Sequence, residues 1–380
     1  MLYTVEEKVT DASFPRSAGA TILIHDKLKL VYNKYKTTRK IPDGVIKINL
    51  VFAHGTGMNK SIWKYHINRF YEFAEKEGWY IDSVLAVDAV GHGDSAIQNQ
   101  GKLGWSYRWE EGSKDLIQVM KYENLTTGDF QNDYYSKNIV IGHSLGGFGA
   151  IMAGFYEPAL IDSVVALDPV MYVTDDMTEK FTLVFDKIAS LLIEKFDSED
   201  DVNEYFKKFS FYKTFRKEIL DDFMKEEVYS EIDPETNEKV FKIKSATRNQ
   251  MATYLMAGVS VPPAMKCLPL LKVPVLHVIA NKGKWNPPES VGFIRGAIPK
   301  KLLSVADIKV GTHLFHAEEP DIVIEPIHEF ILQRKKIAEE SLPYVPELKL
   351  KSDKQRIYDN QWEILLKGNV VESITFGPKL

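Results

Sequence analysis

The feature that most restricts the fold is the sequence Gly-His-Ser-Leu-Gly at residues 142–146, in which the serine is Ser144. An apolar run of strand length at residues 138–141 precedes it, and a run with helical spacing follows at residues 145–156. A serine on a sharp strand-to-helix turn holds a strained backbone, so the residues two positions away on either side must be small. We therefore predict that this turn raises the Ser144 hydroxyl clear of a sheet and exposes it as a nucleophile.

Apolar runs of strand length alternate with longer runs of helical spacing through most of the chain. Strands are expected at residues 21–25, 28–35, 47–53, 83–88, 138–142, 163–167, 275–280 and 302–310. Helices are expected at residues 60–77, 109–122, 145–156 and 320–336. Most of the strands are apolar throughout, which is typical of strands that helices cover on both faces. The alternation predicts an α/β fold, with a mostly parallel eight-stranded sheet, helices on both faces and an opening antiparallel pair.

The pattern changes between about residues 173 and 266, which are rich in Lys, Glu, Phe and Leu at helical spacing and hold no convincing parallel strand. We predict a helical cap at residues 172–268, inserted into a core made of residues 1–171 and 269–340. Residues 341–380 are expected to form a partly ordered tail on the core. The phenylalanines of the cap either line an apolar pocket or form the cap's own interior.

A serine nucleophile needs donors that stabilise the oxyanion of its intermediate. The loop His-Gly-Thr-Gly at residues 54–57 follows an apolar strand, and its glycines let the backbone approach a substrate closely. We predict that the backbone N–H groups of Thr56 and Leu145 form this oxyanion hole. His54 is expected to fix the loop rather than to act as a base.

The base is expected late in the chain if the order is serine, acid, histidine. His313 follows the last expected strand in a loop that carries a glycine, which can bring an imidazole over the nucleophile. His316 is the nearest rival. His328 falls inside an expected helix and His277 in the middle of an expected strand, which favours structural roles for both.

The acid is less obvious, because the loop at residues 281–287, where a carboxylate is commonest in this chain order, contains none. Asp168 directly follows the expected strand 163–167, next to the nucleophile strand. From there a carboxylate can orient the imidazole of His313 and stabilise its charged form. We predict Asp168 as the acid; the alternatives are Asp94, Asp307 and Asp321.

Composition bears on location and partners. The net charge is −5 and there is no long basic stripe, so no nucleic-acid partner is expected. Cys267 is the single cysteine, so no intramolecular disulfide can form, which suits a reducing compartment. The N-terminus lacks the apolar core of a signal peptide, and no apolar run approaches the ~18 residues that span a bilayer. We expect an intracellular protein that is soluble or at most peripheral to a membrane.

The order of these motifs resembles that of the α/β-hydrolase superfamily over residues 20–340, on the segments 52–55, 88–95, 142–147 and 311–313. A more specific likeness, to the fungal peroxisomal lipase and related toxin-biosynthesis hydrolases, lies in segments 49–52, 59–63, 91–96 and 285–288. This resemblance implies the α/β-hydrolase fold, a Ser–acid–His triad, a helical cap and import into peroxisomes.

The residues together predict a serine hydrolase that cleaves a carboxylic ester or thioester, with an ester, a lipid or an acyl-CoA as substrate and no metal or organic cofactor. A lyase-like enzyme with the same triad and a catalytically silent binding protein are the alternatives. The chain ends in Pro378-Lys379-Leu380, close to the Ser-Lys-Leu peroxisomal address that an import receptor reads. The peroxisomal matrix is therefore the expected location, with the cytoplasm as the alternative.

Overall fold

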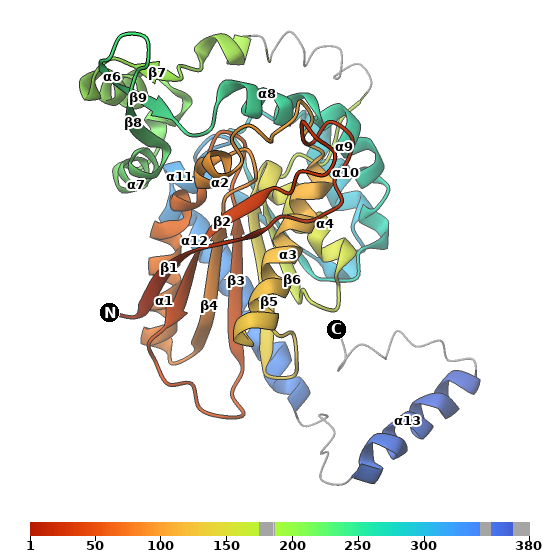
Figure 1. Cartoon of the computed structure of the whole chain (residues 1–380). Coiled ribbons are helices and arrows are strands. Elements are labelled where there is room, and N and C mark those ends of the chain that lie inside the picture. Colours follow the sequence, from red (N-terminus) through yellow and green to blue (C-terminus); the bar gives the residue numbers. More distant parts are fainter. Residues whose placement is uncertain (175–184, 186, 343–350, 368–380) are drawn as a thin grey trace.

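The computed structural model describes residues 1–174, 185, 187–342 and 351–367 (Figure 1). An eight-stranded sheet runs through it in the order β1-β2-β4-β3-β5-β6-β10-β11. Its strands are β1 (Tyr3–Asp11), β2 (Lys29–Thr37), β3 (Lys47–Ala53), β4 (Tyr80–Val87), β5 (Ser136–His143), β6 (Ser163–Leu167), β10 (Val275–Ala280) and β11 (Leu303–Ile308). From β4 to β11 all pairs are parallel, whereas β2 is antiparallel to both β1 and β4. The predicted eight-stranded, mostly parallel sheet is confirmed.

The first strand is not the one predicted. Residues 21–25 form turns, and Thr21 makes only an isolated bridge to Leu103. The partner of β2 is β1, whose residues are mostly exposed at the edge of the sheet. An edge strand tolerates charged side chains that a central strand does not, so its sequence lacks the apolar signature of the other strands.

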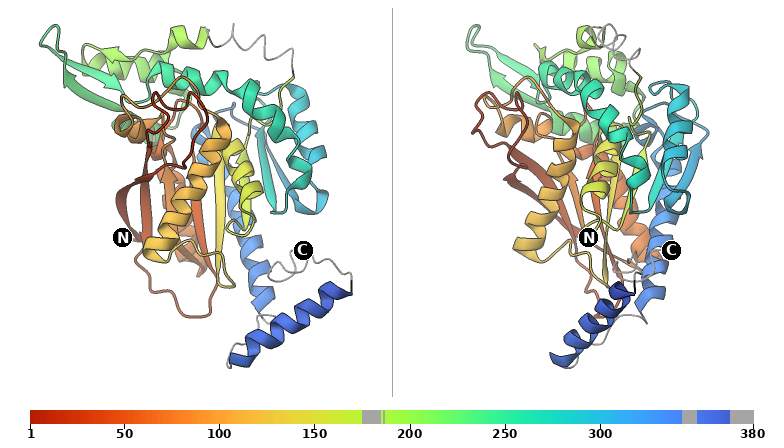
Figure 2. Two further views of the ribbon diagram at one scale, coloured as in Figure 1. Left: turned by 45° about the vertical axis from the view of Figure 1, so that its right-hand side comes forward. Right: turned by 90° about the vertical axis from the view of Figure 1, so that its right-hand side faces the viewer.

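Helices cover both faces of the sheet (Figures 1 and 2). The longer ones are α1 (Lys64–Glu77), α3 (Trp109–Thr127), α4 (Leu145–Tyr156), α10 (Pro288–Ala297) and α12 (Pro320–Ser341); α2 (Gly93–Gln98), α11 (Phe315–Glu318) and the turns η1 (Lys60–Trp63), η4 (Leu268–Leu270) and η5 (Lys300–Leu302) are short. The central strand β5 sends Ile139 and Ile141 into one hydrophobic cluster and Val140 into the other. Its apolar run therefore reflects burial on both faces.

The segment between β6 and β10 forms the cap over one end of the sheet, at the top of Figure 1. It contains α6 (Glu199–Glu204), η2 (Tyr205–Phe209), η3 (Phe211–Thr214), α7 (Lys217–Glu227), α8 (Thr247–Leu255) and α9 (Ala257–Met265). The sequence did not indicate its small antiparallel sheet of β7 (Lys195–Phe196), β9 (Lys239–Ile243) and β8 (Val228–Ile232), in that order. These strands are short and mostly only partly buried, so their residues show little apolar alternation.

Polar contacts hold the cap on the core. The buried carboxylate of Glu227 accepts hydrogen bonds from Asn59 Nδ2 at 3.0 Å and from the Ser245 N–H at 2.7 Å. Beside it, the fully buried ammonium of Lys60 pairs with Asp88 at 3.1 Å and with Asp94. Because the partners come from both core and cap, this part of the cap is tied to the sheet by bonds that water cannot easily replace.

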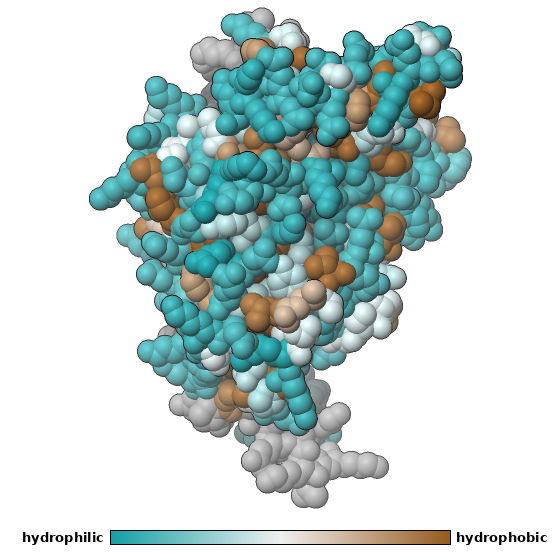
Figure 3. All heavy atoms as spheres, turned by 90° about the vertical axis from the view of Figure 1, so that its left-hand side faces the viewer, coloured by the Kyte–Doolittle hydropathy of each residue, from teal (hydrophilic) through white to brown (hydrophobic). Residues whose placement is uncertain are grey.

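The last two helices that the structure describes are α12 and α13 (Lys351–Leu366). Helix α13 lies at the foot of Figure 2. Among the described helices none is long and apolar enough to cross a bilayer. The face on the left of Figure 1 is predominantly hydrophilic, with small separate hydrophobic patches (Figure 3). The terminal Pro378-Lys379-Leu380 lies outside the described residues.

Candidate active site

The turn between β5 and α4 has the strained geometry that its sequence predicts. Ser144 stands at φ 54° and ψ −113°, a region that residues with side chains rarely occupy. A Cβ on Gly142 would overlap the carbonyl oxygen of Gly146, and one on Gly146 would overlap the carbonyl oxygen of Ala53. Both small residues are therefore required by the close approach of this turn to its own helix and to β3.

His313 and Asp168 are brought together across more than a hundred residues of sequence. The Nδ1 atom of His313 lies 2.7 Å from Oδ2 of Asp168, and Nδ1 carries the proton because a carboxylate only accepts. Oδ1 of Asp168 accepts from Asn286 Nδ2 at 2.8 Å. Burial opposes ionisation of Asp168, but the hydrogen bonds from His313 and Asn286 outweigh it and hold the pKa of this carboxyl below its ordinary value. Nε2 of the ring is left with its lone pair, as a general base requires.

The alternative acids and bases have other partners. Asp94 pairs with Lys60 and Lys244, Asp307 with Arg295, and Asp321 with Arg216 and Tyr65. His277 lies buried in β10 and contacts Arg295, and His328 contacts Glu77 at 2.9 Å. His316 is fully buried and stacks on His143 with ring centroids 3.9 Å apart. Each of these side chains therefore has a contact other than one with Ser144, although both ring nitrogens of His316 are buried without a hydrogen-bond partner among the described residues.

Two cavities meet at Ser144. The larger, of about 440 Å³, is lined by Ser144, His313 and Thr56 among others. The smaller, of about 240 Å³, is also lined by Ser144 and Thr56, but not by His313. Within the described part of the chain the Ser144 hydroxyl makes no hydrogen bond, so it is available to a molecule in either cavity. The hydrogen bond between a catalytic hydroxyl and its base is often long in the absence of substrate and shortens when substrate binds.

Of the predicted oxyanion donors, Thr56 lines both cavities, and Leu145 directly follows Ser144 in the chain. Neither backbone N–H donates to another described residue. Leu145 is the first residue of α4, so its N–H has no acceptor within the helix and carries the positive end of the helix dipole. The Thr56 loop is fixed from the cap, because the Tyr212 hydroxyl donates to the Gly57 carbonyl at 2.6 Å.

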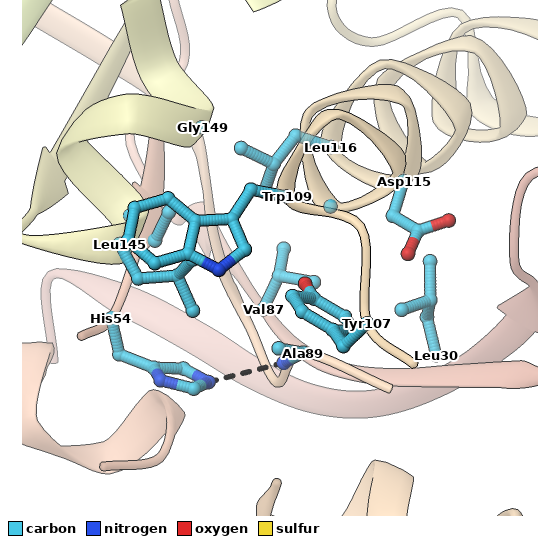
Figure 4. Close-up of a pocket in the computed structure, with 13 residues that line it drawn as sticks. Leu30, His54, Val87, Ala89, Tyr107, Trp109, Asp115, Leu116, Leu145 and Gly149 are labelled. Carbon is cyan, nitrogen blue, oxygen red and sulfur yellow. Dashed lines mark hydrogen bonds between the residues drawn. The ribbon is translucent and has the colours of Figure 1, made fainter. Parts of the chain in front are cut away.

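His54 fixes the start of the same loop, as its position in the sequence suggests. Its Nε2 accepts from the Ala89 N–H at 3.0 Å, and its Nδ1–H donates to the Gly55 carbonyl at 2.9 Å. Burial lowers the pKa of His54, so the ring stays neutral. Figure 4 shows the ring beside Leu145 and Trp109 at a cavity of about 30 Å³, which has room for roughly one water molecule and none for a substrate.

The sequence did not indicate three further residues around His313. Trp285 stacks on its ring with centroids 5.4 Å apart, and Asn286 is the second partner of Asp168. His143, fully buried, donates from Nε2 to the His313 carbonyl at 2.7 Å. Burial holds the pKa of His143 well below its ordinary value. The only sequence signal for His143 was its place beside Ser144. Trp285 and Asn286 belong to segment 285–288, which carries the likeness to the fungal branch but gave no role for either residue.

Possible metal ligands come together at one place in the described part of the chain. The single cluster of three carboxylates found in the described ranges consists of Glu7, Asp94 and Glu226. The Lys60 ammonium contacts Asp94 and lies 3.5 Å from Glu7 and 3.7 Å from Glu226. A cation of the chain itself therefore already lies among these carboxylates.

Comparison with known proteins defines the class. A model of the alpha/beta hydrolase family matches residues 50–325, and with the fold described above the chain belongs to that family. It is 28% identical over 345 residues to the peroxisomal membrane protein LPX1 of Saccharomyces cerevisiae, covering 86% of this chain and 87% of the yeast protein. The solved structure of yeast peroxisomal alpha-beta-hydrolase Lpx1 superposes with a TM-score of 0.84 at 24% identity, covering 98% of this chain and 99% of the other.

A second relative is the type I acyl-CoA thioesterase mpaH of Penicillium roqueforti. It is 24% identical over 170 residues, which cover 44% of this chain and 37% of that protein. The likeness to the fungal peroxisomal branch is confirmed, and family and relatives together support hydrolase activity.

Proposed function

We propose that the chain hydrolyses a carboxylic ester or thioester through an acyl-enzyme on Ser144. The observation that carries the proposal is the convergence, at one cavity, of a strained serine, a histidine bound to a buried carboxylate, and Thr56. The N–H of Leu145 directly follows the serine, and neither this N–H nor that of Thr56 donates to another described residue. A serine hydroxyl is a weak nucleophile by itself, and a base with an orienting acid is the arrangement that activates it.

In the first half of the reaction, Nε2 of His313 takes the proton of the Ser144 hydroxyl as its oxygen attacks the acyl carbon. The carbonyl oxygen becomes an oxyanion between the N–H groups of Thr56 and Leu145. Asp168 stabilises the imidazolium that forms, since its carboxylate stays ionised. The imidazolium then protonates the leaving oxygen or sulfur, the bond from it to the acyl carbon breaks, and the acyl group remains on Ser144.

In the second half, His313 takes a proton from water as the water oxygen attacks the acyl-enzyme. The same two N–H groups hold the second oxyanion. Protonation of the Ser144 oxygen by the imidazolium releases the carboxylic acid and restores the free enzyme. Every proton in this cycle moves through one atom, Nε2, which the bond from Nδ1 to Asp168 leaves free to accept.

Hydrolysis is tested by turnover of p-nitrophenyl esters and acyl thioesters by the wild-type chain and by Ser144→Ala. Wild-type turnover with less than a few per cent remaining in the variant supports the proposal. Turnover that survives in Ser144→Ala identifies another nucleophile. A chain that binds these compounds without turnover is a binding protein, and one that eliminates a group without consuming water is a lyase.

We also propose the peroxisomal matrix as the location, reached through an import receptor that binds Pro378-Lys379-Leu380. The yeast relative, described as a peroxisomal membrane protein, supports the peroxisome as the organelle. A fluorescent protein that carries the last dozen residues should enter peroxisomes of a fungal cell, and deletion of Leu380 should leave it in the cytosol. Diffuse fluorescence from the intact tail would contradict the proposal.

A further inference from the structure

The two cavities at Ser144 differ in one respect that bears on the substrate. His313 lines only the larger one, while Ser144 and Thr56 line both. In the mechanism proposed above, His313 must protonate the leaving group, so the leaving group has to lie on the side of the imidazole. The acyl group then extends into the other cavity.

The lining of the smaller cavity suits an acyl chain. Apart from the residues at the junction it is formed mainly by apolar and aromatic side chains, which are Trp109, Val170, Tyr172, Phe185 and Ala257. Tyr254, Lys284 and Trp285 line both cavities and so stand where the two meet; the rings of Tyr254 and Trp285 have centroids 5.8 Å apart. An apolar chain that enters here is removed from water, which is the main source of binding free energy for such a group.

The larger cavity carries positive charge. Lys282 lines this cavity only, and Lys284 stands at the junction where it lines both cavities; both side chains are exposed, and the lining of the larger cavity includes no Asp or Glu. Among the residues that the structure describes, no carboxylate lies within ion-pair distance of either ammonium group, in contrast to Lys60 and Lys244 nearby in the cap interface. Two exposed cations with no carboxylate partner among the described residues, at a cavity whose lining has no acidic side chain, attract an anion that approaches it.

We propose that the leaving group of this enzyme is a phosphate-bearing thiol, of the coenzyme A type, whose phosphates lie against Lys282 and Lys284. This inference rests on the proposed function. The thioester sulfur lies beside His313, the acyl chain in the smaller cavity, and the phosphate end toward solvent at the rim of the larger one. On bond cleavage the carbon–sulfur electron pair and the proton from Nε2 go to the sulfur, and the free thiol departs with its phosphates.

A matched pair of substrates separates the phosphates from the thioester. Octanoyl-CoA and octanoyl-pantetheine share the acyl group, the thioester and the neighbouring arm, but only the first carries phosphates. KM and kcat are measured for both by release of free thiol. The variant is Lys282→Gln with Lys284→Gln, and the control is Lys272→Gln with Lys300→Gln. The control removes the same charge from exposed lysines that precede β10 and β11, at the opposite edge of the sheet.

The expected result is that KM for octanoyl-CoA rises roughly threefold to tenfold in the Lys282 and Lys284 variant, in line with the strength of exposed charge pairs. The rise for octanoyl-pantetheine should be severalfold smaller, and the control should change neither value by more than about twofold. Added salt should raise the wild-type KM for octanoyl-CoA selectively, because it screens these charges.

Equal changes in KM for the two thioesters, or a wild-type enzyme that does not prefer octanoyl-CoA, overturn the inference. Turnover of p-nitrophenyl esters that depends on Ser144, without turnover of either thioester, overturns it as well and leaves the proposed function standing. Failure of the proposed function has a different signature, since then no ester or thioester is cleaved in a way that depends on Ser144. A melting temperature within a few degrees of the wild type shows that each variant is folded.

Discussion

At the scale of single residues, the site depends on positions where only one side chain fits. Ser144 keeps φ at 54°, and the two glycines beside it leave no room for a Cβ because backbone oxygens occupy that space. Backbone oxygens cannot move aside as a flexible side chain can. The packing of the β-sheet and α4 around this turn therefore keeps its backbone in the strained conformation.

We expect Gly146→Ala to lower the free energy of unfolding by about 1–3 kcal/mol or more and to reduce turnover, because its Cβ would overlap the Ala53 carbonyl. Gly149→Ala in the same helix is the control: its Cβ would lie 3.6 Å from Leu116 Cδ1, an ordinary contact. Alanine there should be neutral or slightly stabilising, since it favours helix. Denaturant unfolding measures both. Equal stability of the two variants would contradict this description of the turn.

Asp168→Asn should reduce kcat by up to ~10⁴-fold with little change in KM, by analogy with the same substitution in serine-protease triads. The amide can donate to Nδ1 and so favours the wrong tautomer of His313. The control is Asp307→Asn, which removes only a contact with Arg295 at the surface. Its kcat should stay within a few-fold of wild type. A small effect at Asp168 together with a large one at Asp307 would reverse the assignment of the acid.

The sequence could predict that His313 and Asp168 lie together, because chain order and strand ends determine where such residues meet. Asn286 and His143 could not be predicted in the same way. Their bonds, to the Asp168 carboxylate and to the His313 carbonyl, form between loops whose relative positions depend on packing of the whole sheet. A polar residue in a loop has no pattern that identifies its partner.

At the scale of elements, the cap shows where sequence patterns fail. Its aromatic residues do not act alike: Phe206 is 1% exposed and packs inside the cap, and Phe209 is 69% exposed. Neither lines a cavity at Ser144, whereas Phe211 does. Helical spacing cannot distinguish these environments. For the same reason, β1 and the strands of the cap, which are short or lie at edges, were not recognised.

Glu227 makes the attachment of the cap sensitive to pH. Burial raises the pKa of this carboxyl to about 7, with a smaller contribution from the charge of Asp88, although Asn59 and Ser245 donate to it. Between pH 4.5 and 7 the folded chain therefore keeps a proton on Glu227 that the unfolded chain has lost. The free energy of unfolding falls as pH rises through this window and levels off above it.

This loss should amount to roughly 1–3 kcal/mol between pH 5 and 8, measured as the free energy of unfolding of the wild type relative to Glu227→Gln. The glutamine cannot titrate, so the difference isolates this one group from the other titrating residues. A difference that stays constant from pH 5 to 8, or that changes in the opposite direction, would show that Glu227 is ionised in the folded chain.

At the scale of the whole molecule, the sheet brings distant parts of the sequence to one edge. The Ser144 turn follows β5, Asp168 follows β6, and the His313 loop follows β11, while the cap between β6 and β10 lies over this edge of the sheet (Figure 1). Carboxyl ends of parallel strands meet at the same edge of a sheet, which is where α/β proteins bind ligands. This arrangement explains why the overall fold was predictable from the alternation of strands and helices, while the cap was predictable only in outline.

The central claim, that an acyl group passes through Ser144, is tested most directly by trapping that intermediate. The wild type is mixed with octanoyl-CoA or a p-nitrophenyl ester, quenched in acid within the first turnovers, digested and measured by mass spectrometry. We predict that the peptide carrying Ser144 gains the mass of the acyl group. The same peptide should show no gain in Ser144→Ala, and His313→Ala should slow its appearance. An acyl group on another residue, or turnover without any acylated peptide, would contradict the account.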